Sequence, residues 1–304
     1  MVLGHGSNVI ASDAGHPGTV VAMNTCGITV TRAEQGRVSV TALAGHALTD
    51  LVQWAASENL AGIECLAGIP GTVGAAPVQN AGAYGQQISD TLDHVTAWDW
   101  AKGHARTLPA ETCQLRYRRS RFKAEPGRWT ILSATFRLRQ ADRAAPISYA
   151  PLAAELGVPI GARPPVPDVV AGVLANRYHR GLLLDRHSAE ARQVGSVFLN
   201  PTVSAVQAAS LAAEGCPTYA DSDGQLRASA GWLLERIGCQ HGAVIADGIR
   251  CSDHRVLTLV ALGDITAAGF AATLSRLAAQ VMAATGIALL PEPVAVGSWG
   301  RSTA

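Results

Sequence analysis

Three residues of the sequence combine a reactive or charged side chain with an unusual local setting. Ser196 follows a glycine at the expected start of a strand, and Glu292 stands between two prolines in an apolar segment. Arg118 belongs to the basic and aromatic run 117–123. No histidine is placed to activate Ser196 and no Gly-x-Ser-x-Gly motif is present, so hydrolysis by a catalytic triad is disfavoured. A serine without a neighbouring base is better suited to donating a proton than to attacking a substrate.

Each of these residues also has an ordinary structural interpretation. A glycine followed by Ser196 can be a structural turn, and alternating arginines like those around Arg118 are common on a solvated strand edge. A carboxylate in apolar surroundings, like that of Glu292, usually has a partner within the protein. The segments that would position these residues therefore have to be considered with them.

Two glycine-rich segments could bind a ligand through their backbone. Residues 68–85 contain five glycines and no charged residue, and Gln79, Asn80 and Tyr84 add polar groups and an aromatic ring. Glycine lets a ligand approach the main chain closely, so amides in this segment can bind a bulky anionic group such as a pyrophosphate. Gly4-x-Gly6-Ser7-Asn8 is a second segment of this kind. The alternatives are tight turns for the longer segment and a hairpin turn for the shorter one.

The composition excludes several classes of function. The 304 residues carry a formal net charge of +1, and basic residues are spread out apart from the 116–123 cluster, which argues against nucleic acid and acidic membranes as partners. The N-terminus lacks the charge pattern of a leader and no apolar run reaches transmembrane length, so we expect a cytoplasmic protein. The six cysteines form no Cys-x-x-Cys pair, and we expect small buried hydrophobes rather than metal ligands or disulfides.

The periodicity of apolar residues predicts an α+β fold in two lobes. Short β-branched segments predict strands on either side of a glycine turn in 2–10 and at 19–23, 28–31, 37–43, 94–100 and 130–138. Helices are expected at 49–59, 151–156, 168–178, 204–215, 230–237 and 269–285. Thr49 and Ser204 are the expected N-caps, and Gly286 is a stop signal. The charged, alanine-rich joint 140–146 predicts a domain boundary that separates 1–141 from 142–304.

Six motifs in a fixed order resemble the UDP-N-acetylenolpyruvoylglucosamine reductase family, from residue 2 to about residue 297. They are Gly4-x-Gly6-Ser7-Asn8, the 68–85 segment, Tyr117-Arg118-x-Ser120, Gly195-Ser196-x-Phe198-x-Asn200-Pro201, Ser229-Ala-Gly-Trp232-Leu-Leu-Glu235 and Pro291-Glu292. The resemblance implies an FAD-binding domain of the vanillyl-alcohol-oxidase (PCMH) type at 1–141 and a substrate-binding domain at 142–304. It also implies NADPH as the reductant, UDP-N-acetylglucosamine enolpyruvate as the substrate, and the peptidoglycan precursor UDP-N-acetylmuramate as the product.

Residue roles are implied by the same resemblance. Ser196 matches the family's proton donor, and Arg118 and Glu292 match the pair that stabilises the enolate-like intermediate. The residues that resemble the UDP-sugar contacts are Tyr117, Tyr149, Asn200 and Arg180, the last standing where lysine is common. The residues that match the FAD contacts are Gly4, Gly6, Ser7, Asn8, Gly68, Ile69, Pro70, Gly71, Thr72, Gly74, Gln79, Asn80, Gly82 and Tyr84. No metal is implied, and we expect a monomer whose partners are small molecules.

The sequence departs from the family's pattern in a few places. Members usually carry roughly fifty residues of the flavin lobe before the Gly4 loop, so we expect either a start upstream of Met1 or a diverged copy. Unusual residue types at 5, 197, 253 and 260 bear on substrate affinity rather than on the three catalytic positions. Two alternatives stand beside the reductase: a homologue that binds a UDP-sugar without flavin turnover, and a flavin oxidoreductase that acts on another nucleotide sugar.

Overall fold

The computed structural model describes residues 1–32 and 36–297, and the chain divides into two compact units. Of the described residues, those within Met1–Gly6 and Val20–Leu183 belong to unit 1, and those within Ser7–Thr19 and 184–297 belong to unit 2. These units differ from the predicted division at residues 141 and 142, because the 142–183 segment packs with unit 1. The chain also leaves unit 1 after Gly6 and returns at Val20, which no sequence pattern indicated.

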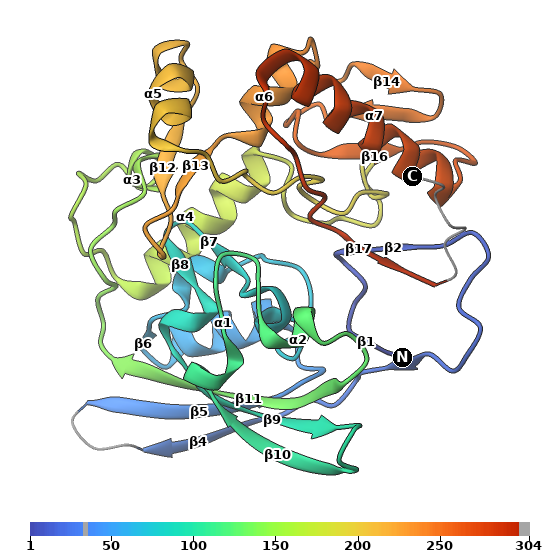
Figure 1. Ribbon diagram of the computed structural model, residues 1–304. Helices are drawn as coiled ribbons and strands as arrows, with labels where there is room; N and C mark the ends of the chain where they lie inside the picture. The colour runs from blue at the N-terminus through green and yellow to red at the C-terminus, as the bar shows by residue number, and fades with distance from the viewer. Residues whose placement is uncertain (33–35, 298–304) are drawn as a thin grey trace. The chain divides into compact units, whose positions relative to one another are not determined.

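Unit 1 is built on an antiparallel sheet, seen at the bottom of Figure 1. The strand order is β10-β9-β11-β5-β4, and β6 also pairs with β11. The bounds are β4 Ile28–Arg32, β5 Arg37–Leu43, β6 Leu60–Ala61, β9 Leu92–Asp99, β10 His104–Pro109 and β11 Trp129–Gln140. Side chains in β5 and β9 alternate between buried and partly exposed, as expected for a sheet with one face on the core. The strands predicted at 28–31, 37–43, 94–100 and 130–138 are confirmed.

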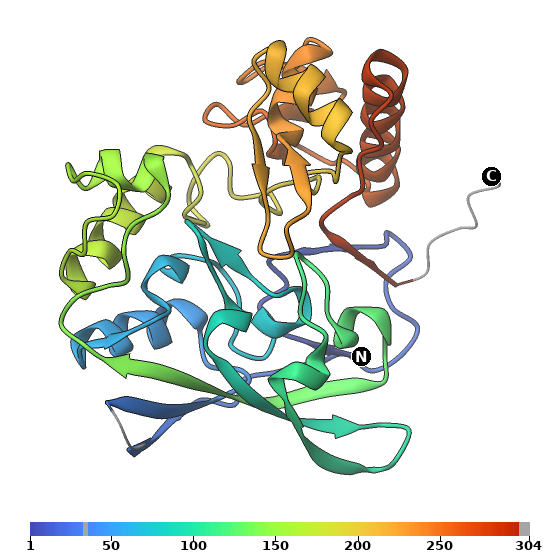
Figure 2. The same ribbon diagram turned by 60° about the vertical axis from the view of Figure 1, so that its left-hand side comes forward.

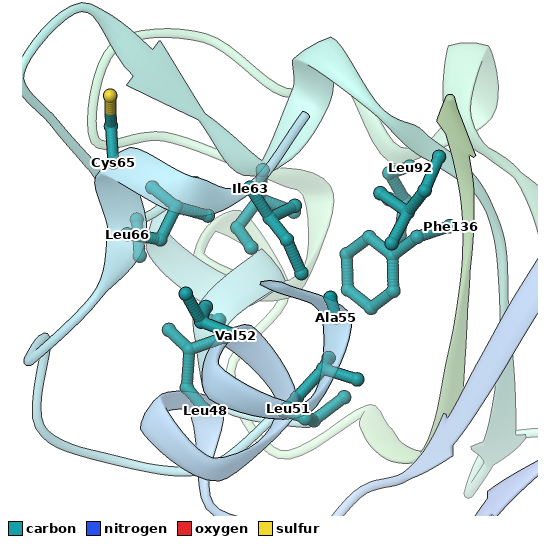
Figure 3. Close-up of a cluster of buried hydrophobic side chains, with 14 of the residues drawn as sticks. Leu48, Leu51, Val52, Ala55, Ile63, Cys65, Leu66, Leu92 and Phe136 are labelled. Atoms are coloured by element: carbon teal, nitrogen blue, oxygen red, sulfur yellow. The ribbon is translucent and has the colours of Figure 1, made fainter. Parts of the chain in front are cut away.

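One face of this sheet is covered by helix α1, Leu48–Ser57, and the shared core is drawn in Figure 3. Leu51 and Ala55 of α1 are fully buried in one cluster with Phe136 of β11. The predicted cap of this helix is wrong, because α1 begins after Ala47 and Thr49 lies inside it. The Thr49 hydroxyl instead accepts a hydrogen bond from the Gly68 amide at 3.1 Å, which ties the helix to the glycine-rich segment.

The rest of unit 1, as far as the structure describes it, consists of short elements and three further helices. Helix α4, Val166–His179, packs on α1 and on α3, Ala150–Glu155, so both helices predicted in this region are confirmed. Strand β1, Val2–Leu3, pairs in parallel with β3, Val21–Ala22. The remaining elements are β7 Gly82–Ala83, β8 Gln86–Gln87, α2 Arg121–Ala124 and the 3₁₀ turns Glu64–Leu66, Ala76–Gln79, Ile88–Asp90 and Ala110–Cys113.

Over its described residues, unit 2 contains three helices and small sheets. The helices are α5 Ala205–Ala213, α6 Ala230–Arg236 and α7 Ala267–Thr285, the last drawn in dark red in Figures 1 and 2. The strands are β12 Thr218–Ala220, β13 Leu226–Ala228, β14 Val244–Ala246, β15 Ile249–Cys251 and β16 Leu259–Ala261. Strand β2, Val9–Ala11, pairs in parallel with β17, Val294–Val296. The 2–10 segment therefore does form two strands, but β1 and β2 pair with different partners and do not make a hairpin.

Hydrogen bonds at the helix ends of unit 2 agree with the capping signals in the sequence. The Ser204 hydroxyl accepts from the Gln207 amide and the Gln207 side chain accepts from the Ser204 amide, so the predicted capping box is confirmed. Helix α7 starts two residues earlier than predicted, because Thr266 acts as its N-cap. It ends at Gly286, whose φ of +68° is the left-handed conformation that glycine favours at this position.

Two further expectations concern the burial of the cysteines and the lack of a transmembrane segment. Five of the six cysteines are buried, as predicted, whereas Cys26 is exposed, and all six are free thiols. Among the described residues, the structure contains no helix that is both long enough and apolar enough to cross a bilayer.

Replacement of Phe136 by alanine tests the packing of the core of unit 1. The Phe136 side chain is 1% exposed, so Phe136→Ala leaves a cavity, and the free energy of unfolding should fall by about 3–5 kcal/mol. Val30→Ala on the edge strand β4, where the side chain is 45% exposed, is the matched control and should cost less than about 0.5 kcal/mol. Urea unfolding followed by tryptophan fluorescence measures both values. Equal losses for the two variants would contradict the packing described.

Candidate active site

The glycine-rich segment 68–85 folds into a series of tight turns held close to the rest of unit 1. The Val73 amide donates to the His46 carbonyl and the Gly74 amide donates to the Ala44 carbonyl at 2.8 Å. A Cβ atom added at Gly74 would lie 2.6 Å from the Ala44 Cβ, so glycine is required there by close packing. At Gly71 glycine is required instead by a φ of +121°. The 68–85 segment therefore does form tight turns, and this conformation is compatible with binding a ligand.

The two glycine-rich segments meet inside unit 1. A Cβ atom added at Gly4 would lie 2.7 Å from the Thr72 Oγ1, so the two backbones are in contact only because Gly4 has no side chain. In the part of the chain that the structure describes, the amides of Gly4, His5, Gly6, Gly71 and Thr72 donate to no protein acceptor. Unpaired amides on two adjoining loops are a suitable lining for the oxygens of an anion. We call these five residues the amide cradle.

Asn80 holds the end of the glycine-rich segment in place. Its side chain is fully buried, and its φ of +45° is left-handed. The Asn80 Oδ1 accepts from the Ser89 amide at 2.9 Å, and its Nδ2 donates to the Gln87 Oε1, the Ser89 hydroxyl and the Arg116 carbonyl. Both polar atoms of the Asn80 side chain, which was predicted to contact FAD, therefore form hydrogen bonds within the protein. Asn80 joins three segments of unit 1.

Arg118 is fixed to the same segment. Its guanidinium donates to the Asn80 carbonyl at 3.1 Å and to the Gly82 carbonyl at 2.7 Å, and it lies over the Tyr117 ring. The strand-edge interpretation of this run is wrong, because residues 116–119 form a turn in which Arg118 has a φ of +52°. Helix α2 follows at once with Ser120 as its N-cap. The turn presents the guanidinium to the backbone carbonyls of Asn80 and Gly82.

The other residues predicted to contact FAD lie in several different local environments. Ile69 packs partly buried against the core of unit 1, Pro70 precedes the Gly71 turn, and Gln79 ends a 3₁₀ turn. Ser7 and Asn8 belong to unit 2, where the Asn8 carbonyl accepts from the Val294 amide. The predicted Gly4–Asn8 loop is therefore shared between the two units.

Two predicted residues of unit 1, Tyr84 and Tyr149, lie in an edge-to-face contact with ring centroids 5.5 Å apart. The Tyr84 hydroxyl donates to the Asn176 Oδ1 at 3.1 Å, which connects the segment to helix α4. Arg177 on the same helix is 8% exposed, and burial lowers the pKa of its guanidinium, an effect that Tyr84 opposes and Arg180 increases. No pattern in the sequence indicates Asn176 or Arg177, because both stand at ordinary helix positions in the apolar pattern of α4.

In unit 2 the backbone brings Ser196 and Glu292 together. The Val197 amide donates to the Leu257 carbonyl, and the Glu292 amide donates to the Val197 carbonyl at 3.0 Å. The Asn8 side chain donates to the Glu292 carbonyl at 3.5 Å. Residues 196–198 are thus held between residues 257–258 and 290–292, and the two predicted catalytic residues lie on neighbouring segments.

Sequence reasoning missed a third residue at this place. The Arg255 Nη2 donates to the Ser196 Oγ at 3.4 Å. Arg255 stands after Asp253 and His254 in a polar turn that precedes β16, and nothing in its spacing from Ser196 indicates the contact. Only the pairing of the two backbone segments brings the side chains within reach.

Asn200 lies further along the Ser196 segment and is engaged within unit 2. Its Oδ1 accepts from the Ala230 amide at the start of α6, and its Nδ2 donates to the Tyr219 hydroxyl at 2.7 Å. Its carbonyl accepts from Arg227, which also forms an ion pair with Asp221 at 2.8 Å. Burial acts to raise the pKa of Asp221, but hydrogen bonds from Arg227 and from backbone amides outweigh it, so the net shift is downward. The ionised carboxylate therefore fixes Arg227 at neutral pH.

Comparison with known proteins gives matches along nearly the whole chain. A family model described as an FAD binding domain matches residues 1–108, and one described as the C-terminal domain of UDP-N-acetylenolpyruvoylglucosamine reductase matches residues 187–296. The reductase of that name from Cutibacterium acnes is 38% identical over 98% of this chain and 78% of its own length, and that from Thermobifida fusca is 37% identical over 98% and 85%. The fold is similar to the crystal structure of the Thermus caldophilus reductase, with a TM-score of 0.60 at 22% identity over 97% of this chain and 84% of that one.

Replacement of Asn80 by alanine tests its role as the link between three segments. Asn80→Ala leaves buried hydrogen-bonding groups unpaired and places alanine at a left-handed φ, so the free energy of unfolding should fall by roughly 2–4 kcal/mol. Gln53→Ala, which removes an exposed amide side chain from α1, should change it by less than about 0.5 kcal/mol. Thermal and urea unfolding compare the two. A loss no larger than that of the control would show that Asn80 does not hold these segments together.

Proposed function

The chain belongs to the UDP-N-acetylenolpyruvoylglucosamine reductase family, and from this premise we infer how its residues carry out the reaction. It is an FAD-dependent oxidoreductase that consumes NADPH and reduces UDP-N-acetylglucosamine enolpyruvate to UDP-N-acetylmuramate in peptidoglycan precursor synthesis. The observation that carries the proposal for the site is the amide cradle, supported by the contact between Gly4 and Thr72.

The amide cradle suits the pyrophosphate of FAD. Its free N–H groups are donors without a protein acceptor, and a diphosphate offers several acceptor oxygens with negative charge. Gly68, Gly74 and Gly82 allow the supporting turns to pack closely, and Asn80 acts as a positioning residue beneath them. When bound and reduced by NADPH, FAD supplies the hydride of the reaction.

Arg118 is proposed to stabilise the charge that develops on the substrate. Hydride addition to the enolpyruvyl double bond pushes negative charge toward the substrate carboxylate, and a guanidinium that is already fixed stabilises this charge without reorganisation. The Asn80 and Gly82 carbonyls and the Tyr117 ring hold Arg118 in this way.

Ser196 is proposed as the proton donor, with Glu292 beside it. The backbone pairing between their segments supports this pair, and the Arg255 guanidinium next to the Ser196 hydroxyl favours donation over attack. Glu292 orients Ser196 or relays a proton to it. Protonation of the substrate carbon next to the one that has received hydride completes the reduction.

The assignment of domains and of the UDP-sugar contacts is also a proposal. Residues 1–141 are assigned to FAD binding and residues 142–304 to substrate binding, supported by the two family models that match 1–108 and 187–296. The UDP-sugar is assigned to Tyr117, Tyr149, Arg180 and Asn200. A monomer acting in the cytoplasm fits small-molecule substrates of this kind, and light scattering of the purified protein tests the oligomeric state.

Replacement of Gly4 by alanine tests the amide cradle. The added methyl group meets the Thr72 hydroxyl at 2.7 Å and must push the loops apart, so the Kd for FAD should rise roughly tenfold or more, equivalent to about 1.4 kcal/mol. Gly231→Ala is the control, because its Cβ would find neighbours only at 3.7 and 3.8 Å and its helical position tolerates alanine. Flavin fluorescence titration measures both. Unchanged FAD affinity in Gly4→Ala would remove this loop contact from the proposed site.

Replacement of Ser196 by alanine separates the two half-reactions. Reduction of bound FAD by NADPH should proceed at nearly the wild-type rate, whereas reoxidation by the enolpyruvyl substrate should slow by roughly 10²–10⁴-fold, because the proton donor is missing. Stopped-flow absorbance at the flavin band follows each step. Similar losses in both steps would refute the role assigned to Ser196. A wild-type protein that binds the UDP-sugar but no FAD would favour the non-redox homologue instead.

A further inference from the structure

We propose that Arg255 is a positioning residue that makes the Ser196 hydroxyl a stronger acid. The contact that suggests this role is the hydrogen bond of 3.4 Å from the Arg255 Nη2 to the Ser196 Oγ. The inference rests on the proposed function of Ser196 as proton donor, and it adds the group that acts on that donor.

The direction of this hydrogen bond determines where the Ser196 proton can go. A guanidinium has donors and no acceptor, so the Ser196 Oγ must be the acceptor in its contact with Arg255. The hydroxyl proton is therefore not used in this bond and is directed to another acceptor. In the proposed reaction that acceptor is the substrate carbon.

Proton transfer leaves a charge on Ser196 that Arg255 stabilises. The Oγ–H bond breaks as the new C–H bond forms, and its electron pair stays on oxygen as an alkoxide. A hydrogen bond from a guanidinium to an anionic oxygen is roughly twice as strong as one between neutral groups, so the contact strengthens as the proton leaves. Water then returns a proton to the alkoxide and the hydroxide left over passes to the solvent, so Arg255 neither gives nor takes a proton in the step.

Backbone hydrogen bonds around Arg255 hold its contact with Ser196 in place. Ser196 pairs with Thr258 in an isolated β-bridge, and the Thr258 amide donates to the Arg255 carbonyl at 3.2 Å. The Ser252 amide donates to the Thr258 carbonyl at 2.8 Å, which closes the turn that carries Arg255. The backbone pairing that holds the Ser196 segment therefore also fixes the backbone position from which the Arg255 side chain extends.

Two acidic residues near the turn that carries Arg255 form ion pairs with a different arginine. Glu190 and Asp253 both form ion pairs with Arg250, at 3.1 and 2.8 Å. Among the described residues, His254 on the same turn and Glu292 on the segment paired with Val197 also carry titratable side chains near Ser196 and Arg255. Arg255 therefore places a positive charge at the Ser196 oxygen, opposite in sign to the carboxylate of Glu292.

The first test uses a thiol at position 196 as a probe that needs neither cofactor nor substrate. In the full chain carrying Ser196→Cys, alkylation of that thiol by iodoacetamide is followed against pH by mass spectrometry of the peptide. Adding Arg255→Gln should raise the apparent thiol pKa by about one unit, because a nearby cation stabilises the thiolate. Adding Arg255→Lys should restore most of the difference. Arg236→Gln, which removes a 57% exposed arginine near the end of α6, should leave the pKa unchanged.

The second test measures the reaction itself in otherwise wild-type protein. Arg255→Gln should slow flavin reoxidation by substrate roughly tenfold to a hundredfold and increase its solvent deuterium isotope effect, because proton transfer becomes more limiting. Reduction by NADPH should be unchanged, and Arg255→Lys should recover most of the rate. An unshifted thiol pKa together with equal isotope effects in the Gln and Lys variants would overturn the proposal. Full turnover by Ser196→Ala would instead overturn the proposed role of Ser196, and the thiol titration would still report on Arg255.

Discussion

The hydrogen bonds of one buried amide side chain, that of Asn80, set the geometry on which the candidate site of unit 1 depends. Because its Nδ2 and Oδ1 reach the 87–89 segment and the 116–119 turn, the glycine-rich segment cannot move independently of either. The carbonyls of Asn80 and Gly82 then become the anchor of Arg118. A polar group used entirely inside the protein thereby places both a backbone that can bind an anion and a cation that can stabilise one. Such networks are expensive to leave incomplete, so they define a single arrangement.

The sequence allowed most of the secondary structure to be predicted, because strands and helices have periodic apolar patterns that are local. The strand at 37–43 and the helix near 269–285 are examples, and the capping box at Ser204 is another. What failed depended on partners distant in the sequence. Thr49 was a plausible cap by local chemistry, yet its hydroxyl binds the Gly68 amide, and the run around Arg118 is a turn because Asn80 and Gly82 accept its hydrogen bonds.

The candidate site shows the same division between local and distant information. Ser196, Arg118 and Glu292 could be selected from motif order, since each stands in an unusual short pattern. Arg255 could not, because its distance from Ser196 is set by pairing between residues 196–197 and 257–258. The need for glycine at position 4 could be predicted only in part. The sequence shows the glycine, but the Thr72 hydroxyl that leaves no room for a side chain there lies on another loop.

The division of the chain between the units has a consequence for the order in which the protein can fold during synthesis. In the part of the chain that the structure describes, strand β2 pairs with β17 alone, and with Val9 paired to Val294 it is made long before its partner. A nascent chain on the ribosome can assemble the sheet of unit 1 while β2 still has an open edge. Open edges pair readily with other chains, so the period before β17 is made is the one in which this protein most needs protection by a chaperone.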